Sequence, residues 1–217
     1  MKIGVLGTGM VGSTLASRFA ALGHEVRMGA RESGNARAKA WVAGAGKNAS
    51  SGDFAEAAAF GEIVFNCTLG EKAVEALRAA KKENLKGKVL VDVSNPLDFS
   101  RGMPPRVLTG PNGESLGERI QEELPEARVV KALNTVNAGV MVDPKRVGGE
   151  SDLFVCGNDA DAKTRVAALL RELGWTRVHD LGPIVAARGT EAYLLFWITL
   201  MGAFKTADFN VRIVRPS

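Results

Sequence analysis

The chain has 217 residues, 46% of them hydrophobic and 24% charged, and this length allows a single domain with a substantial core. Its net charge of +4 is small, no run of basic residues exceeds two, and aromatic residues do not alternate with basic ones, which argues against a nucleic-acid partner. The N-terminus lacks a signal-peptide pattern, and Cys67 and Cys156 lie in apolar strand-like segments, so we expect a cytoplasmic protein with free thiols.

The chain offers few candidates for a membrane span, a metal site or acid–base catalysis. Its longest apolar stretch, residues 193–204, falls short of the roughly 18 apolar residues that a span requires. His24 follows Gly23 at a predicted helix end, where capping is its expected role, and His179 lies in a strand pattern; neither has an evident partner. We therefore predict no membrane partner and no metal site, and we identify no catalytic residue.

The first twelve residues organise the rest of the chain. Residues 3–6 are typical of a buried parallel strand, and they lead into a complete G-x-G-x-x-G and then an amphipathic helix pattern. In this setting the first glycine permits the tight turn, the second lets the backbone approach a pyrophosphate, and the third lets the helix pack on the strand. The predicted cofactor-binding residues here are Gly7, Thr8, Gly9, Met10, Val11 and Gly12.

The end of the next predicted strand, residues 25–28, indicates which dinucleotide is bound. An NAD site would place an acidic residue here, on the ribose 2′-hydroxyl, but the chain has Ala30 and Arg31, and a carboxylate follows only at Glu32. Arginine pairs with a 2′-phosphate, so we predict preference for NADP; the alternative is that Arg31 is a solvated loop residue. For Arg37 and Lys39, in the following predicted helix, surface solvation is the better interpretation.

Three further strands, at residues 62–68, 88–93 and 128–133, end in polar or turn-forming residues. Ligands of open parallel sheets bind beyond the carboxyl ends of the strands, so these residues are placed to line the nicotinamide half of the site. Each of them could also serve a turn alone, and for Asn-Pro by itself the turn is the better interpretation; Lys131 is interpreted as strand edge. The predicted residues are Thr68, Leu69, Asn95, Pro96 and Asn134.

The remaining pattern predicts a doubly wound α/β fold of Rossmann type, with a mostly parallel sheet. Helices are expected at 35–46, 53–60, 71–82 and 114–124, and loops at 98–112, over the site, and at 138–150. A β-α-β unit is expected over 153–180, then a helix over 187–204 and a final strand over 209–214. We predict one NAD(P)-binding domain, 1–217, with residues 181–217 as a C-terminal helix–strand extension.

Four segments together resemble the coenzyme F420-dependent NADP oxidoreductase family, in particular its short bacterial dinucleotide-binding relatives: residues 1–12, 29–31, 129–135 and 209–214. Val-Lys-Ala-Leu-Asn-Thr-Val-Asn, from residue 130, and the overall length are the more specific features. The NADPH-binding domain of membrane-bound metalloreductases is a related match. The resemblance implies NADPH on residues 7–12 with Arg31 at the 2′-phosphate. It also implies Thr68, Leu69, Asn95 and Asn134 near the nicotinamide, and a homodimer built partly from the C-terminal helix. Ala30 replaces the family's usual hydroxyl residue, which removes one hydrogen bond from that phosphate site.

The function that this resemblance implies is hydride transfer between NADPH and a flavin, a deazaflavin (F420) or another small planar acceptor. The acceptor would lie in an apolar pocket walled by residues 134–141 and the C-terminal helix. Such enzymes mainly hold two ring systems face to face, which agrees with the lack of a catalytic pair. The chain has no room for the longer C-terminal domain of hydroxyacid dehydrogenases, so that reaction is disfavoured. A non-catalytic NADP(H)-binding sensor or interaction module is the alternative.

Overall fold

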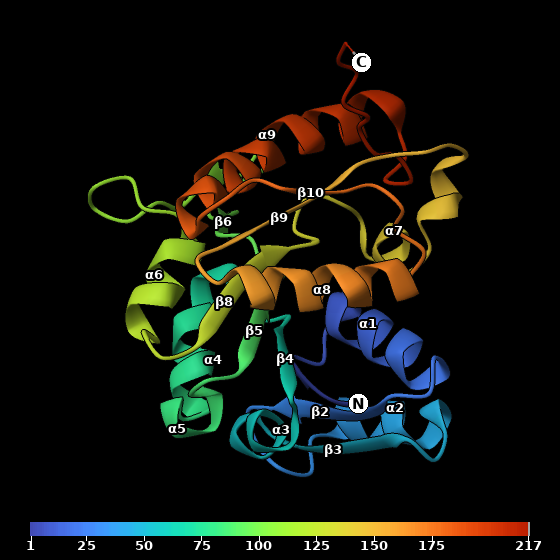
Figure 1. The fold of residues 1–217 in the computed structure, drawn as a ribbon, viewed down its shortest axis with the longest axis vertical. Coiled ribbons are helices and arrows are strands. Elements are labelled where there is room, and N and C mark those ends of the chain that lie inside the picture. The colour runs from blue at the N-terminus through green and yellow to red at the C-terminus, as the bar shows by residue number, and fades with distance from the viewer. Residues whose placement is uncertain (217) are drawn as a thin grey trace.

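Eight short strands form one sheet in the computed structural model, which describes residues 1–216 (Figure 1). They are β1 (Lys2–Leu6), β2 (Glu25–Ala30), β3 (Ala49–Asp53), β4 (Ile63–Asn66), β5 (Val89–Asp92), β8 (Arg128–Ala132), β9 (Leu153–Gly157) and β10 (Val178–Asp180). The sheet order is β10-β9-β8-β5-β4-β1-β2-β3, and every neighbouring pair is parallel except β8 and β9. β6 (Leu97–Asp98) and β7 (Arg106–Val107) form a separate antiparallel pair.

The order of the strands determines where a ligand site is expected. From β1 the chain moves outward through β2 to β3, and then returns to the other side of β1 with β4. The carboxyl ends of β1 and β4 therefore flank a topological switch point, where open α/β sheets bind their ligands. The predicted Rossmann-type fold is confirmed.

Helices cover both faces of the sheet. One face carries α1 (Met10–Ala21), α2 (Ala36–Ala45), α7 (Ala138–Val142) and α8 (Ala160–Glu172), whose buried residues pack in one core with Phe19, Phe65 and Trp175. The other carries α3 (Phe54–Phe60), α4 (Ala73–Ala79), α5 (Lys82–Leu85) and α6 (Leu116–Glu123), around Leu77 and Leu90. Three 3-10 turns are η1 (Gly70–Lys72), η2 (Pro144–Val147) and η3 (Ile184–Ala186), and the last leads into α9 (Ala187–Phe204).

Several predicted elements differ from the observed ones, and one observed strand has no predicted counterpart. The predicted loop over 138–150 contains α7 and η2, and the helix over 71–82 is divided into η1, α4 and α5, with Lys81 at a φ of +65° between the last two. Strand β3 was missed because Ala-Ser-Ser-Gly-Asp lacks an apolar pattern. The predicted final strand over 209–214 is wrong: these residues form no ladder and are held instead by single contacts to Asp152.

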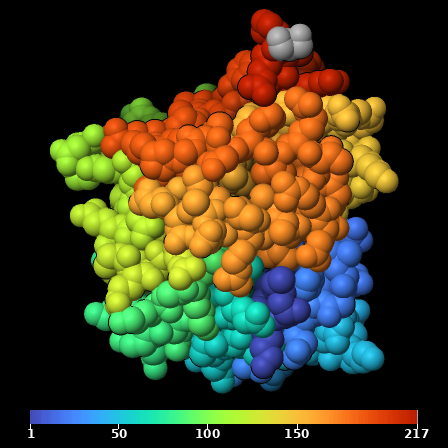
Figure 2. Space-filling view, viewed as in Figure 1, coloured from blue at the N-terminus to red at the C-terminus, as the bar shows by residue number. Residues whose placement is uncertain are grey.

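Helix α9 is long and apolar. With η3 it spans 21 residues (Ile184–Phe204) at a mean hydropathy of 1.3, so by length and composition it does reach the size of a membrane span, contrary to expectation. Only 33% of an 18-residue window of this helix is buried, although the charged residue Glu191 on it is packed against α6. In Figure 2 the orange and red C-terminal segments occupy the upper part of the face shown, and the blue and cyan segments the lower part.

Candidate active site

The glycine turn between β1 and α1 has the geometry that its sequence predicts. Gly7 has a φ of +119°, and a Cβ there would lie 2.7 Å from the carbonyl oxygen of Cys67. A Cβ on Gly12 would lie 2.1 Å from the Gly7 carbonyl oxygen, so only glycine lets α1 approach the turn this closely. Gly9, in contrast, faces open space, with no atom within 4 Å of the Cβ position. Backbone can therefore meet a ligand at Gly9.

The N-terminus of α1 is available to an anion. Gly9 is the N-cap residue and provides no side-chain acceptor, and the first turn holds no acidic residue. The free N–H groups and the positive end of the helix dipole therefore face the region beside Gly9 without a protein counter-charge. This arrangement fits the pyrophosphate of a dinucleotide.

A cavity of about 430 Å³ lies on the β2 side of the turn. Ala30 and Arg31 line it as predicted, and so does Arg37, which is exposed as expected and also borders this cavity. Among the described residues that line it there are two arginines and no carboxylate. Two guanidinium groups suit a 2′-phosphate, and an acid would repel one. The full lining is Gly7, Thr8, Ala30, Arg31, Asn35, Ala36, Arg37 and Phe54.

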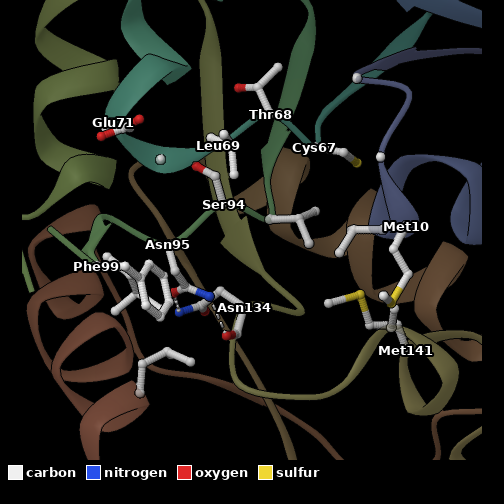
Figure 3. A pocket seen from close by; sticks show the side chains of 18 of the residues that line it. Met10, Cys67, Thr68, Leu69, Glu71, Ser94, Asn95, Phe99, Asn134 and Met141 are labelled. Carbon is white, nitrogen blue, oxygen red and sulfur yellow. Dashed lines mark hydrogen bonds between the residues drawn. The ribbon is translucent and has the colours of Figure 1, made fainter. Parts of the chain in front are cut away.

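A larger cavity of about 920 Å³ lies on the β4 side and shares Gly7, Thr8 and Arg37 with the smaller one. In Figure 3 Met10 and Met141 lie at one end of it and Phe99 at the other, with Asn95 and Asn134 bonded to each other. Its size is that of a ligand site and its walls are mostly apolar. The predicted residues that line it are Gly7, Thr8, Gly9, Met10, Val11, Thr68, Leu69, Asn95 and Asn134.

The walls of the larger cavity also agree with the expected position of an acceptor. Val136, Ala138 and Met141 line it from the segment after β8, and Leu194 and Trp197 from α9. The loop after β5 contributes residues 97–100, which confirms that it covers the site. Cys67, Ser94 and Trp197 also line the cavity, and no pattern in the sequence distinguishes them as site residues.

Pro96 is the one predicted nicotinamide-side residue that the cavity excludes. It is buried, and its carbonyl oxygen accepts a hydrogen bond of 2.7 Å from the Leu108 N–H. Pro96 thus anchors the β6–β7 hairpin, and its neighbour Asn95 lines the cavity.

Lys131, interpreted as strand edge, is instead fully buried within an ion cluster behind the cavity. Its ammonium group lies 2.6 Å from Oδ2 of Asp92 and 2.8 Å from Oε1 of Glu191, and it donates to the Ser94 carbonyl oxygen at 2.7 Å. Burial alone would lower the pKa of Lys131, but the two carboxylates more than offset this, so the pKa lies above its ordinary value. The lysine stays charged.

The described lining of the larger cavity holds two carboxylates, those of Glu71 and Asp98, and one thiol, that of Cys67. Cys67 lines it, but burial and the charge of Asp92 raise the pKa of its thiol, so it stays protonated. The bonds that Asp98 accepts from Ser100 hold the pKa of that carboxyl below its usual range, so it is no proton donor at neutral pH. Both cysteines are free, as expected.

Both histidines have carboxylate partners, contrary to the sequence interpretation. Nε2 of His24 lies 2.9 Å from Glu172, which links the end of α1 to α8, and the His24 main-chain N–H caps α1, as expected, by donating to the Phe19 carbonyl oxygen at 3.1 Å. Nε2 of His179 lies 2.8 Å from Asp152, which also pairs with Arg177 and accepts from the Ile213 N–H. Neither histidine lines a cavity described above.

Comparison with known proteins identifies relatives of this arrangement. Residues 2–96, from β1 to the loop after β5, match the family model described as NADP oxidoreductase, coenzyme F420-dependent. The F420-dependent NADP reductase of Methanocaldococcus jannaschii is 33% identical over 159 residues, which cover 73% of this chain and 70% of that protein. Metalloreductase STEAP3 of Rattus norvegicus is 30% identical over 192 residues, which cover 88% of this chain and 36% of that protein. The provisionally named F420-dependent NADP-reductase of Arthrobacter sp. FB24 has a solved structure that superposes with a TM-score of 0.93, at 51% identity over 99% of this chain and 100% of that one.

Proposed function

The chain belongs to the coenzyme F420-dependent NADP oxidoreductase family, and on that basis we propose that it transfers a hydride between NADPH and a flavin, a deazaflavin (F420) or a similar planar acceptor. The observation that carries the proposal is that two cavities meet at Gly7 and Thr8. The smaller is lined by two arginines, the larger is mostly apolar, and the N-terminus of α1 lies between them.

The residues present fit NADP(H), whose chemistry is hydride donation from the reduced nicotinamide. Gly9 and the first turn of α1 would hold the pyrophosphate, and Arg31 and Arg37 the 2′-phosphate. Thr68, Leu69 and Asn95 would then border the nicotinamide in the larger cavity. The chain's part is to bind, orient and exclude water, which is sufficient when no strong acid or base is needed.

The acceptor would lie against the far walls of the same cavity. Met141 and Leu194 provide apolar contact, and Trp197 provides an aromatic face that suits a planar ring. Trp197 stacks on Phe209 at 5.2 Å between ring centroids and an interplanar angle of 22°, so a ring from the C-terminal segment backs this wall.

The test is the decay of NADPH absorbance with purified protein and a panel of FMN, FAD, riboflavin and F420, alongside a titration of NADPH binding. Protein-dependent decay with one acceptor supports the proposal and identifies the substrate. Tight NADPH binding with no decay for any acceptor contradicts it and favours the non-catalytic NADP(H) sensor. A parallel assay with NADH as donor measures cofactor preference.

We further propose that the protein is a cytoplasmic homodimer, with α9 at the subunit interface. Phe196 and Phe204 on this helix are 56% and 59% exposed, and Leu195 is 40% exposed, which is typical of a surface that a second copy covers. Light scattering on the wild type and on Phe196→Glu tests this: we expect a dimer and a monomer, respectively. A monomeric wild type, or recovery in the membrane fraction, would contradict it.

A further inference from the structure

The buried cluster of Lys131, Asp92 and Glu191 joins two walls of the larger cavity. Asp92 and Lys131 lie on the neighbouring strands β5 and β8, whereas Glu191 lies on α9, one turn before Leu194 and two turns before Trp197. The side chains of all three are 0–2% exposed. Burial of one lysine and two carboxylates away from solvent costs free energy unless each charged group is paired and hydrogen-bonded.

The excess negative charge of this cluster is matched by donors on every side. Glu191 accepts the N–H groups of Leu116 and Gly117, at 2.8 and 3.0 Å, and these begin α6. Asp92 accepts from Ser94 Oγ at 2.6 Å and from Asn66 Nδ2 at 2.8 Å. The cluster is therefore fully hydrogen-bonded, and each of its members has a fixed position.

The chain of bonds continues to the cofactor side of the cavity. The Thr68 hydroxyl, on the cavity wall, donates to Oδ1 of Asn66 at 2.7 Å, and Asn66 donates to Asp92. From Asp92 the contacts run through Lys131 to Glu191 on α9. A second link lies beside the first, because Asn134 donates to the Thr190 carbonyl oxygen at 3.0 Å. Two consecutive residues of α9 are thus fastened to strand ends that border the cavity.

We propose that Glu191 is a positioning residue for the acceptor: its contact with Lys131 sets the distance of α9, and so of Leu194 and Trp197, from the cofactor wall. The inference rests on the proposed function, since it assumes that the acceptor lies against α9. Glu191 does not line the cavity and acts through the helix that carries it.

Glu118 provides a matched control for this residue. It is a second carboxylate at the contact between α6 and α9, and it accepts two bonds of 2.8 Å from Arg188. This pair lies toward solvent and bonds neither Lys131 nor a residue of the larger cavity. Glu118 also belongs to the capping box of α6 through Ser115, but it bonds none of Lys131, Asp92 and Glu191, so its loss weakens the same helix pair and leaves the bonds within the buried cluster in place.

The experiment compares Glu191→Gln with Glu118→Gln in the full chain. Glutamine at 191 keeps one acceptor oxygen, enough for one of the two α6 N–H groups, and loses the negative charge that pairs with Lys131, while Lys131 retains Asp92. We expect the KM for the acceptor to rise roughly tenfold or more in Glu191→Gln, as a small misplacement of a reactant does, with the Kd for NADPH unchanged. In Glu118→Gln the KM for the acceptor stays at the wild-type value. Equal changes in both variants, or equal losses in acceptor KM and NADPH Kd, would overturn the positioning role.

Amide hydrogen exchange gives a second readout that needs no acceptor. Faster exchange over residues 190–198 in Glu191→Gln than in Glu118→Gln is the expected result, because the buried link is lost only in the former. Unchanged exchange there contradicts the inference even if an acceptor is found. If the wild type turns over no acceptor, the proposed function fails while this measurement still decides whether Glu191 fixes α9.

Discussion

Asn95 and Asn134 bond each other across the carboxyl ends of β5 and β8. Nδ2 of Asn95 donates to the main-chain oxygen of Asn134 at 2.8 Å, and Nδ2 of Asn134 donates to Oδ1 of Asn95 at 3.0 Å (Figure 3). Asn134 Nδ2 also donates to the Thr190 carbonyl oxygen. Both of its amide hydrogens are thus used within the protein, so we interpret Asn134 as holding the cavity edge and α9 in register.

Replacement of Asn134 by Asp tests this interpretation. A carboxylate there would face two oxygens, those of Asn95 and Thr190, with no hydrogen to donate. We expect a loss of about 1–3 kcal/mol in the free energy of unfolding, measured by urea denaturation, because buried acceptors are left unpaired. The matched control is Asn137→Asp: its side chain only accepts, from the Gly139 N–H at 2.8 Å, so Asp serves equally well. Equal losses in the two variants would refute the interpretation.

Alanine substitutions at Gly9 and Gly12 distinguish a position that contacts the ligand from one that packs within the protein. Gly9 has extended backbone (φ −78°, ψ −175°) and open space at its Cβ position, so alanine fits the free protein. We expect the free energy of unfolding of Gly9→Ala to lie within about 1 kcal/mol of the wild-type value. We expect this variant to bind NADPH more weakly, because the methyl group occupies the place of the phosphates. The added methyl group in Gly12→Ala forces α1 away from the glycine turn, so we expect the free energy of unfolding to fall by on the order of 1–3 kcal/mol.

Thermal unfolding with and without NADPH measures both effects. The expected pattern is a near-normal melting temperature with a reduced NADPH-induced rise for Gly9→Ala, and a lowered temperature without ligand for Gly12→Ala. A normal NADPH-induced rise in Gly9→Ala would exclude the pyrophosphate from this turn.

Arg31 and Arg37 are expected to determine the preference for NADPH over NADH. Each guanidinium would lose a charge-assisted bond on replacement by alanine, worth about 1.5–3 kcal/mol, which is on the order of tenfold or more in the Kd for NADPH. NADH has no 2′-phosphate, so its Kd should change little. Fluorescence titration of both nucleotides measures this. The control is Lys39→Ala, because Lys39 lies on α2 with Arg37 but lines neither cavity. Equal losses of affinity for NADPH and NADH in the arginine variants would contradict the assignment.

Local patterns predicted the part of the site that depends on local geometry. The turn from residue 7 to residue 12 needs small residues at fixed spacing, so its role could be inferred without the fold. The same holds for Arg31, whose position follows directly from the end of β2. The capping box of Asp53 and Glu56 at the start of α3 is also local, and the structure contains it.

Long-range contacts account for what the sequence could not predict. Lys131 meets Glu191 across 60 positions, and no periodicity indicates that a lysine in an apolar strand has two buried carboxylates beside it. Asp152 likewise pairs with Arg177 and His179 and accepts a hydrogen bond from the Ile213 N–H. The alternation over 209–214 predicts a strand, but these contacts with Asp152 hold the segment instead. Arg37 reaches two cavities only because α2 begins beside the glycine turn.

The pair of Glu118 and Arg188 predicts how the α6–α9 contact responds to acid. Chiefly because Arg188 donates to the carboxylate, the pKa of Glu118 falls from its ordinary value of 4.5 to about 2. The folded protein therefore holds this proton less tightly than the unfolded chain does. The stabilisation is fully present above pH 4.5, declines as the pH falls, and is lost near pH 2.

We therefore expect the melting temperature of Glu118→Gln to lie below that of the wild type at neutral pH, and the difference to shrink between pH 4.5 and about 2. Arg188→Gln should show the same convergence, because either variant breaks the ion pair between Glu118 and Arg188. The double variant should be no less stable than the weaker single one, since one interaction is lost only once. A difference from the wild type that persists unchanged at the acid end would mean that Glu118 stabilises the contact through packing, because only the ionic part depends on its proton.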